Sequence, residues 1–113
     1  MKEIEAYIKP HKLLDVAMAL QKVQRLRGMS VVEVKGFGRR NGKDVPHSAV
    51  NDLRDFAKYV KIEIFCHDDL ADEIVSIINR TAYTGLRGDG RIYVSAVEKT
   101  FKIGKGEIVE ADI

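Results

Sequence analysis

The segment that decides the fold is Tyr59-Val60-Lys61-Ile62-Glu63-Ile64-Phe65-Cys66, in which apolar and polar side chains alternate. Such alternation predicts a β-strand with one buried face. The acidic pair Asp68 and Asp69 then offers an N-terminal cap for an amphipathic helix. That helix is predicted from apolar residues at helical spacing: Leu70, Ile74, Ile77 and Ile78. A further strand is predicted over residues 91–98, and a short one around 101–103.

The N-terminal half of the chain repeats this order of patterns. A strand is predicted over residues 3–8, a helix over 10–23 and a strand over 29–35, while residues 38–58 have no apolar periodicity. Two strand-helix-strand units predict an α+β, ferredoxin-like fold, in which a four-stranded antiparallel sheet carries both helices on one face. The length of 113 residues fits a single domain, residues 1–113.

The two faces of this sheet are expected to differ. The helices are predicted to cover one apolar set: Ile4, Ile8, Val60, Ile62, Ile64, Ile92 and Val94. The opposite face then carries Tyr7, Phe65, Tyr93 and Val97 among charged residues. An exposed aromatic surface of this kind usually marks an interaction site, so we expect another subunit or a ligand to cover it.

The composition is that of an ordinary soluble domain, with 45% hydrophobic and 32% charged residues. It excludes a disordered or low-complexity chain, and no apolar run approaches the roughly 20 residues that cross a bilayer. The N-terminus lacks the apolar stretch of a signal peptide, and the single cysteine, Cys66, cannot form an internal disulfide, so a cytoplasmic location is expected. The net charge of +2 is too small to indicate nucleic-acid binding.

Residues 38–58 form a candidate contact surface. A segment of this length without its own secondary-structure pattern is usually functional or disordered. It carries five basic and three acidic residues, and its net charge of +2 equals that of the whole chain. These polar side chains are the candidates for that contact: Lys43, Asp44, His47, Asp52 and Arg54.

Three glycines interrupt the pattern in Thr84-Gly85-Leu86-Arg87-Gly88-Asp89-Gly90-Arg91. Clustered glycines let successive backbone N–H groups point at one anion, and a flanking arginine adds charge and donors. The alternative is a plain structural turn between a helix and a strand. The Gly-Lys-Ser/Thr ending of a P-loop is missing.

Other chemistries are disfavoured by the residues themselves. Lys35-Gly36-Phe37-Gly38 opens like an RNA-recognition motif, but no aromatic follows, and a dinucleotide fingerprint would need a glycine at Asn41. The candidate metal ligands lack ligand spacing, so no metal site is predicted: His11, His47, His67 and Cys66. No catalytic Ser-His-Asp or Cys-His set can be named, and we do not expect an enzyme.

The chain resembles the P-II family of nitrogen-regulatory signal-transduction proteins along nearly its whole length. The resemblance rests on segments that match in order and spacing: Met1-Lys2-Glu3-Ile4-Glu5-Ala6, Ile8-Lys9-Pro10, Gly28-Met29-Ser30-Val31, Glu33-Val34-Lys35-Gly36-Phe37-Gly38-Arg39, Val60-Lys61-Ile62-Glu63-Ile64, Arg80-Thr81-Ala82, Thr84-Gly85 and Gly88-Asp89-Gly90-Arg91-Ile92. It implies a homotrimer that binds ATP, ADP or AMP in the clefts between subunits and regulates a transporter or an enzyme. Contact with a membrane would be indirect, through a transporter partner.

The resemblance also implies three functional loops: a T-loop over about 38–58 that touches target proteins, a B-loop over 84–91 and a C-loop over about 102–107. Nucleotide phosphates would meet the T-loop base at Gly36, Gly38 and Arg39, and the B-loop at Gly88, Asp89, Gly90 and Arg91. The nucleotide site would also include Arg40, Thr84 and Gly85. The adenine end would be lined by Ser30, Glu63 and Phe65, and the C-loop would contribute Lys102. Glycine amides and arginine suit a polyphosphate.

The sequence departs from the family pattern where a second ligand would bind. Arg40 stands where the family places a glutamine that helps to hold Mg²⁺ and 2-oxoglutarate. Tyr59 stands where the family places a lysine that pairs with a 2-oxoglutarate carboxylate. We therefore expect little response to 2-oxoglutarate. Bicarbonate is the alternative second input, and it would make the protein a regulator of carbon uptake rather than of nitrogen control.

Other departures affect nucleotide binding and covalent regulation. Asp52 replaces the tyrosine that many enteric-type members uridylylate, and Leu86 replaces a B-loop lysine. Lys102 and Gly104 replace two C-loop arginines, which weakens the expected grip on the outer phosphates. Competing functions on this fold are an acylphosphatase-like hydrolase of small phosphates, whose cradle is absent, and an RNA-binding module. A third is a trimer of the divalent-cation-tolerance kind, in which the Gly88-Asp89-Gly90 cradle has no counterpart.

Overall fold

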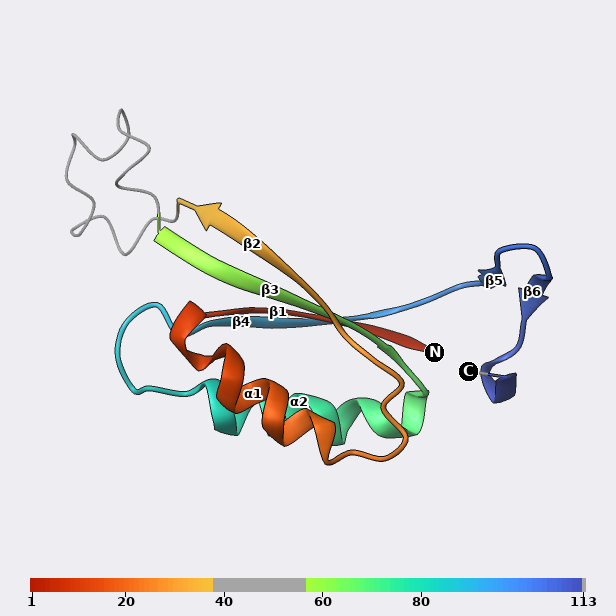
Figure 1. Ribbon diagram of the computed structural model, residues 1–113, viewed down its shortest axis with the longest axis horizontal. Helices are drawn as coiled ribbons and strands as arrows, with labels where there is room; N and C mark the ends of the chain where they lie inside the picture. The colour runs from red at the N-terminus through yellow and green to blue at the C-terminus, as the bar shows by residue number, and fades with distance from the viewer. Residues whose placement is uncertain (38–56, 113) are drawn as a thin grey trace.

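The chain folds into a four-stranded sheet with two helices on one face (Figure 1). The computed structural model describes residues 1–37 and 57–112. The sheet consists of β1 (Lys2–Ile8), β2 (Ser30–Gly36), β3 (Ala57–Cys66) and β4 (Gly90–Ala96), which pair antiparallel in the order β2-β3-β1-β4. The helices are α1 (Leu13–Gln21) and α2 (Ala71–Ala82). This arrangement confirms the predicted ferredoxin-like fold.

Short 3₁₀ turns precede both helices. The helix predicted over residues 10–23 is divided into η1 (Pro10–Lys12) and α1, and the second helix begins with η4 (Asp68–Leu70). Proline is well placed at the start of η1, because its missing N–H would be unpaired there in any case. The tight turn is closed by a hydrogen bond of 3.0 Å from the Lys12 N–H to the carbonyl oxygen of Lys9.

The core lies between the sheet and the helices. Along β1 and β3 the buried residues face each other in register, with Ile4 opposite Ile64 and Ile8 opposite Val60. The helices contribute a second apolar layer: Val16, Leu20, Ile74, Ile77 and Ile78. Burial of one such side chain contributes about 1.5–3 kcal/mol relative to exposure. The alternation that predicts the strands is therefore also what stabilises the sheet against the helices.

One residue of the predicted core is not covered. Val94 lies opposite Ile4, on the helix-bearing face, yet 48% of its surface is exposed. β4 is an edge strand, and only Ile92, nearer its start, packs against the core. The prediction that the helices cover Val94 is therefore wrong, because the helix layer does not extend along the whole edge strand.

The C-terminal residues form a small hairpin of β5 (Thr100–Lys102) and β6 (Gly106–Ile108), which projects beyond the end of β4 (Figure 1). The sequence predicts only the first of these strands, because three residues are too few to show a period. After the hairpin, η5 (Glu110–Asp112) returns to the start of the chain. There Glu110 accepts a hydrogen bond of 2.6 Å from the Asp68 N–H and lies 3.3 Å from the Met1 ammonium.

The acidic pair before α2 does not cap the helix as predicted. No side-chain hydrogen bond caps η4 or α2. Asp68 instead lies 2.8 Å from the Met1 ammonium, and Asp69 pairs with Arg25 at 3.0 Å. Both carboxylates therefore bind cations from other segments of the chain, and the pKa of each is lowered by that partner.

Candidate functional site

The glycine-rich turn links α2 to β4. Because α2 ends at Ala82 and β4 begins at Gly90, the turn occupies residues 83–89. Gly85 and Gly88 have φ angles of +79° and +78°, in the left-handed region that other residues rarely adopt. These two glycines are thus required by the path of the backbone itself.

Gly90 is required by a close approach of two strands. Its φ angle is +111°, and a Cβ atom at this position would lie 1.7 Å from the carbonyl oxygen of Tyr7 on β1. No side chain fits at that distance. Gly90 therefore has a structural role in pairing β4 with β1, whatever ligand the turn binds.

The carboxylate of Asp89 closes the turn. Its Oδ2 accepts hydrogen bonds from the N–H groups of Thr84 (2.9 Å) and Gly85 (3.0 Å), and its Oδ1 accepts one from the Thr84 hydroxyl. The ammonium of Lys9 lies 3.1 Å from the same Oδ1 atom. The Thr84 hydroxyl above all, with the Thr84 and Gly85 amides and Lys9, holds the pKa of Asp89 well below its usual range. Asp89 is therefore ionised at neutral pH.

This geometry refines the predicted roles of the turn residues. The Asp89 carboxylate is directed at the turn's own N–H groups, and a carboxylate would in any case repel a phosphate. The N–H groups of Thr84 and Gly85 are already engaged by it. The phosphate-binding roles predicted for Gly88, in the turn, and Arg91, in β4, do not meet this conflict and stay predictions. Lys9 is the residue that sequence reasoning missed, since no local pattern links it to a turn 75 positions away.

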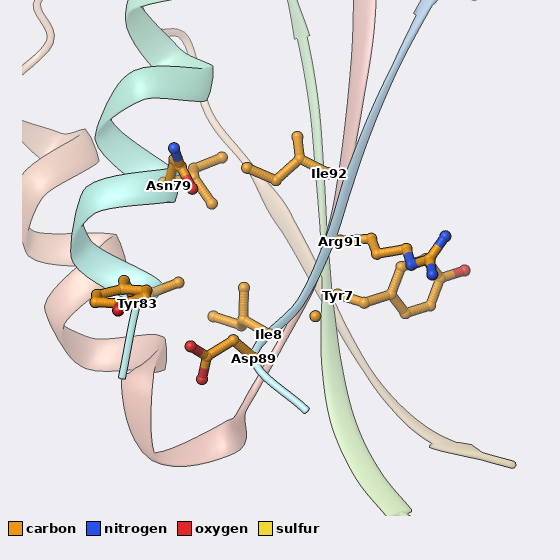
Figure 2. Close-up of a pocket in the computed structure, with 10 residues that line it drawn as sticks. Tyr7, Ile8, Asn79, Tyr83, Asp89, Arg91 and Ile92 are labelled. Carbon is orange, nitrogen blue, oxygen red and sulfur yellow. The ribbon is translucent and has the colours of Figure 1, made fainter. Parts of the chain in front are cut away.

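Side chains near the turn leave the sheet on both faces (Figure 2). Asp89 and Ile92 lie on the helix side, beside a hollow of about 250 Å³ between α2 and the ends of β1 and β4. Arg91 lies beside Tyr7 on the face without helices, which we call the open face. The Tyr7 ring packs edge-on against Tyr93, with ring centroids 6.2 Å apart. Arg91 thus presents its guanidinium next to an aromatic pair on the open face.

The predicted nucleotide residues fall into two sets along the sheet, one at one end and one from the middle of the sheet onward. In the register of the strands, Gly90 pairs with Ile8 and Ile8 with Val60, while Gly36 pairs with Ala57. The B-loop and the T-loop base therefore share one end, which we call the near end. It holds Gly36, Thr84, Gly85, Gly88, Asp89, Gly90 and Arg91.

The second set lies toward the other end, the far end. Ser30 pairs with Glu63, and Phe65 lies two residues further along β3. Lys102 lies in the hairpin beyond the end of β4 (Figure 1). Ser30 and Gly36 are the two ends of β2, so they are about 20 Å apart at roughly 3.4 Å per residue. Ser30 is therefore far from the T-loop base within one chain, while Glu63 pairs with Glu5 in the middle of the sheet.

Several predicted residues lie outside the described residues. These are Gly38, Arg39 and Arg40 of the T-loop base, and the partner-contact candidates Lys43, Asp44, His47, Asp52 and Arg54. Their predicted roles stay predictions. The residues that flank this segment are held next to each other, because Gly36 and Ala57 are partners in the β2–β3 ladder.

Carboxylates gather on the open face, a feature that the sequence analysis did not predict. Glu3, Glu5 and Glu63 can bring one oxygen each within 4.8 Å of one another. Lys61 lies 3.8 Å from Glu63 and compensates part of this charge.

Cys66 is buried on the helix-bearing face, and this burial raises the pKa of its thiol.

Comparison with known proteins identifies the family. The profile of the family described as nitrogen regulatory protein P-II matches residues 1–107. The chain belongs to this family. It is 47% identical over 107 residues, 95% of each chain, to the nitrogen regulatory protein P-II of Bradyrhizobium diazoefficiens. It is also 47% identical over 113 residues, the full length of both chains, to nitrogen regulatory protein P-II 1 of Escherichia coli K12.

Membership of the P-II family confirms the resemblance found in the sequence. P-II proteins are regulatory signalling proteins that act on partner proteins, so the expectation that this chain is not an enzyme is confirmed as well. Within residues 1–37 and 57–112, none of the helices has the length and apolar character needed to span a membrane.

Acid denaturation tests the Asp89 network in this P-II protein. Because the folded-state pKa of Asp89 is depressed, its contribution to stability is present above the ordinary carboxyl pKa of about 3.9 and is lost as the pH falls below it. We expect Asp89→Asn to lower the melting temperature at neutral pH. We also expect the melting temperature of this variant to fall less than that of the parent between about pH 5 and about pH 3.

Asp69→Asn is the matched control. Asp69 also has a lowered pKa, but its partner Arg25 is at the surface, and exposed ion pairs contribute little to stability. This variant is expected to melt close to the parent at neutral pH. If Asp89→Asn has the parent's melting temperature at neutral pH and loses as much of it on acidification, the role assigned to the carboxylate is contradicted.

Proposed function

We propose that the protein is a homotrimeric sensor that binds ATP, ADP or AMP between its subunits and regulates a partner protein through the T-loop. The observation that carries this proposal is the spread of the predicted nucleotide residues along one sheet, from the near end to beyond its middle. Each chain offers two half-sites. Two copies of the chain placed side by side would bring both sets to one nucleotide.

The open face supports association of the chains. Phe65 and Tyr93 are 50% and 52% exposed, and Val32 on β2 is 47% exposed. Aromatic and apolar side chains of this kind favour burial against a partner. In a ring of three copies, the near end of one sheet can face the far end of the next, which would complete the site that one chain leaves divided.

The charges at the near end support an anionic ligand. Arg91 and Lys61 both lie on the open face, on either side of Tyr7 in the register. Guanidinium and ammonium groups beside backbone N–H donors suit a phosphate chain. Further along the same face, the carboxylates of Glu3, Glu5 and Glu63 would repel an RNA backbone, which disfavours the RNA-binding alternative.

If the open face is buried between copies of the chain as proposed, the protein is a trimer in solution. Light scattering is expected to report three times the chain mass of 12.7 kDa at micromolar concentration. Phe65→Glu is expected to dissociate it, because a carboxylate would be buried without a partner. Leu14→Glu, at a residue of α1 that is 69% exposed on the helix layer, is the control and is expected to stay trimeric. A monomeric parent would overturn both the trimer and the shared nucleotide site.

Nucleotide binding is tested by calorimetry with ADP and ATP. Arg91→Ala is expected to weaken binding by about 1.5–3 kcal/mol, the contribution of a charge-assisted hydrogen bond. Gly88→Val is expected to abolish it, because valine is strained at a φ of +78°. Arg80→Ala, which removes an exposed arginine on α2, is the control. If both B-loop variants bind as the parent does while remaining trimeric, the B-loop is not the phosphate site.

The second input is proposed to differ from 2-oxoglutarate. Tyr59 lies opposite Val34 and shares the open face with Lys61, while the neighbouring Lys58 leaves the strand on the other face. Lys58 therefore does not replace the family's lysine at position 59. Bicarbonate, a smaller anion, is the alternative, in a regulator of carbon uptake.

Separate titrations decide between the two anions. The nucleotide-loaded protein is titrated with 2-oxoglutarate plus Mg²⁺ and, independently, with bicarbonate. We expect no measurable heat from 2-oxoglutarate, since a phenol cannot replace a lysine ammonium. Tight, Mg²⁺-dependent binding of 2-oxoglutarate would contradict the weight placed on Tyr59 and Arg40. A protein that responds to neither anion would have the nucleotide as its only input.

A further inference from the structure

Lys9 connects the end of β1 to both ends of the glycine-rich turn. It follows Ile8, the last residue of β1, and its side chain is only 19% exposed. Its Nζ atom lies 3.0 Å from the hydroxyl oxygen of Thr84, where the turn begins, and 3.1 Å from Oδ1 of Asp89, where it ends. One ammonium group thus holds both ends of the turn against the sheet.

The chemistry of the groups fixes the direction of each hydrogen bond. A lysine ammonium and a backbone N–H can only donate, and an ionised carboxylate can only accept. The Thr84 hydroxyl therefore donates its single proton to Asp89 and accepts from Lys9 and, at 3.1 Å, from the Leu86 N–H. All acceptor and donor roles in this network are mutually consistent, which allows it to form before any ligand is present.

We propose that Lys9 is a positioning residue for the phosphate site of the B-loop, which it holds in its binding conformation in the free protein. This inference rests on the proposed nucleotide function. Lys9 does not itself touch the ligand in this proposal. It contacts Asp89 and Thr84, and through them it positions the neighbouring Gly88 and Arg91, the residues predicted to meet the phosphates.

Two physical effects make the binding of phosphate depend on Lys9. A turn with two glycines has high conformational freedom, and ordering it on binding would reduce affinity. Lys9 also neutralises the Asp89 carboxylate, which would otherwise place a net negative charge, held only by neutral donors, beside the ligand's phosphates. Both effects act on the phosphate part of the ligand and leave the base and the ribose largely unaffected.

The test compares four ligands across three variants by calorimetry. For Lys9→Gln, which removes the charge and leaves a polar side chain one bond shorter, we expect ADP and ATP to bind about tenfold more weakly, equivalent to about 1.4 kcal/mol. The loss is expected to be smaller for AMP and absent for adenosine. Lys9→Arg is expected to recover most of the affinity. Lys12→Gln removes a cation from the next turn, where it pairs with Asp15 at 3.2 Å, and is the control.

Hydrogen exchange in the nucleotide-free protein provides an independent readout. In Lys9→Gln, the amides of Thr84, Gly85 and Leu86 are expected to exchange faster, while those of α2 and β1 keep the parent's rates. Equal weakening for adenosine and ADP, or general loss of protection, would show a merely structural lysine and overturn the proposal. Unchanged ADP affinity in Lys9→Gln would overturn it too.

A parent protein that binds none of the four ligands would refute the proposed function itself. In that case the positioning role falls with it, and faster exchange at residues 84–86 would report only a structural contact. The failure of the inference and the failure of the proposed function are therefore distinguished by the parent's own binding curve.

Discussion

The contact between Gly90 and the Tyr7 carbonyl is the constraint on which the site depends. Only a residue without Cβ allows β4 to pair with the end of β1 at this distance. That pairing sets where the turn joins the sheet, and it brings Asp89 within reach of Lys9. It also directs Arg91 to the open face and Ile92 toward the helices. A side chain at position 90 would disturb all of these relationships at once.

The sequence predicts the parts of the fold that have a period. β3 and α2 are clear because their apolar residues recur at strand and helix spacing over many residues. β6 has three residues and no period, so it is not predictable in this way. Val94 shows a second limit, since alternation assigns a residue to a face but does not say how far the helix layer extends over an edge strand.

The candidate site is predictable as a list of residues but not as an arrangement. Resemblance to the P-II family names Ser30, Glu63 and the B-loop glycines together, while only the register of the strands separates them into two half-sites. The Lys9–Asp89 contact joins residues from two distant segments, and no spacing rule predicts it. Likewise, Asp68 and Asp69 look like helix caps in the sequence because their cationic partners are remote in the chain.

The pairing of Gly36 with Ala57 has a consequence for how the family can diversify. β2 ends at Gly36 and β3 begins at its partner Ala57, so the two anchors are fixed at one point of the ladder. The register of β2 and β3 also includes pairs deeper in the sheet, such as Val31 with Ile62. The entropy of closing a loop rises only logarithmically with its length, by about 0.6 kcal/mol per doubling. Insertions, deletions and wholesale replacement between these anchors therefore cost the scaffold little. The fold can therefore change this one segment while the rest of the chain stays under its original constraints.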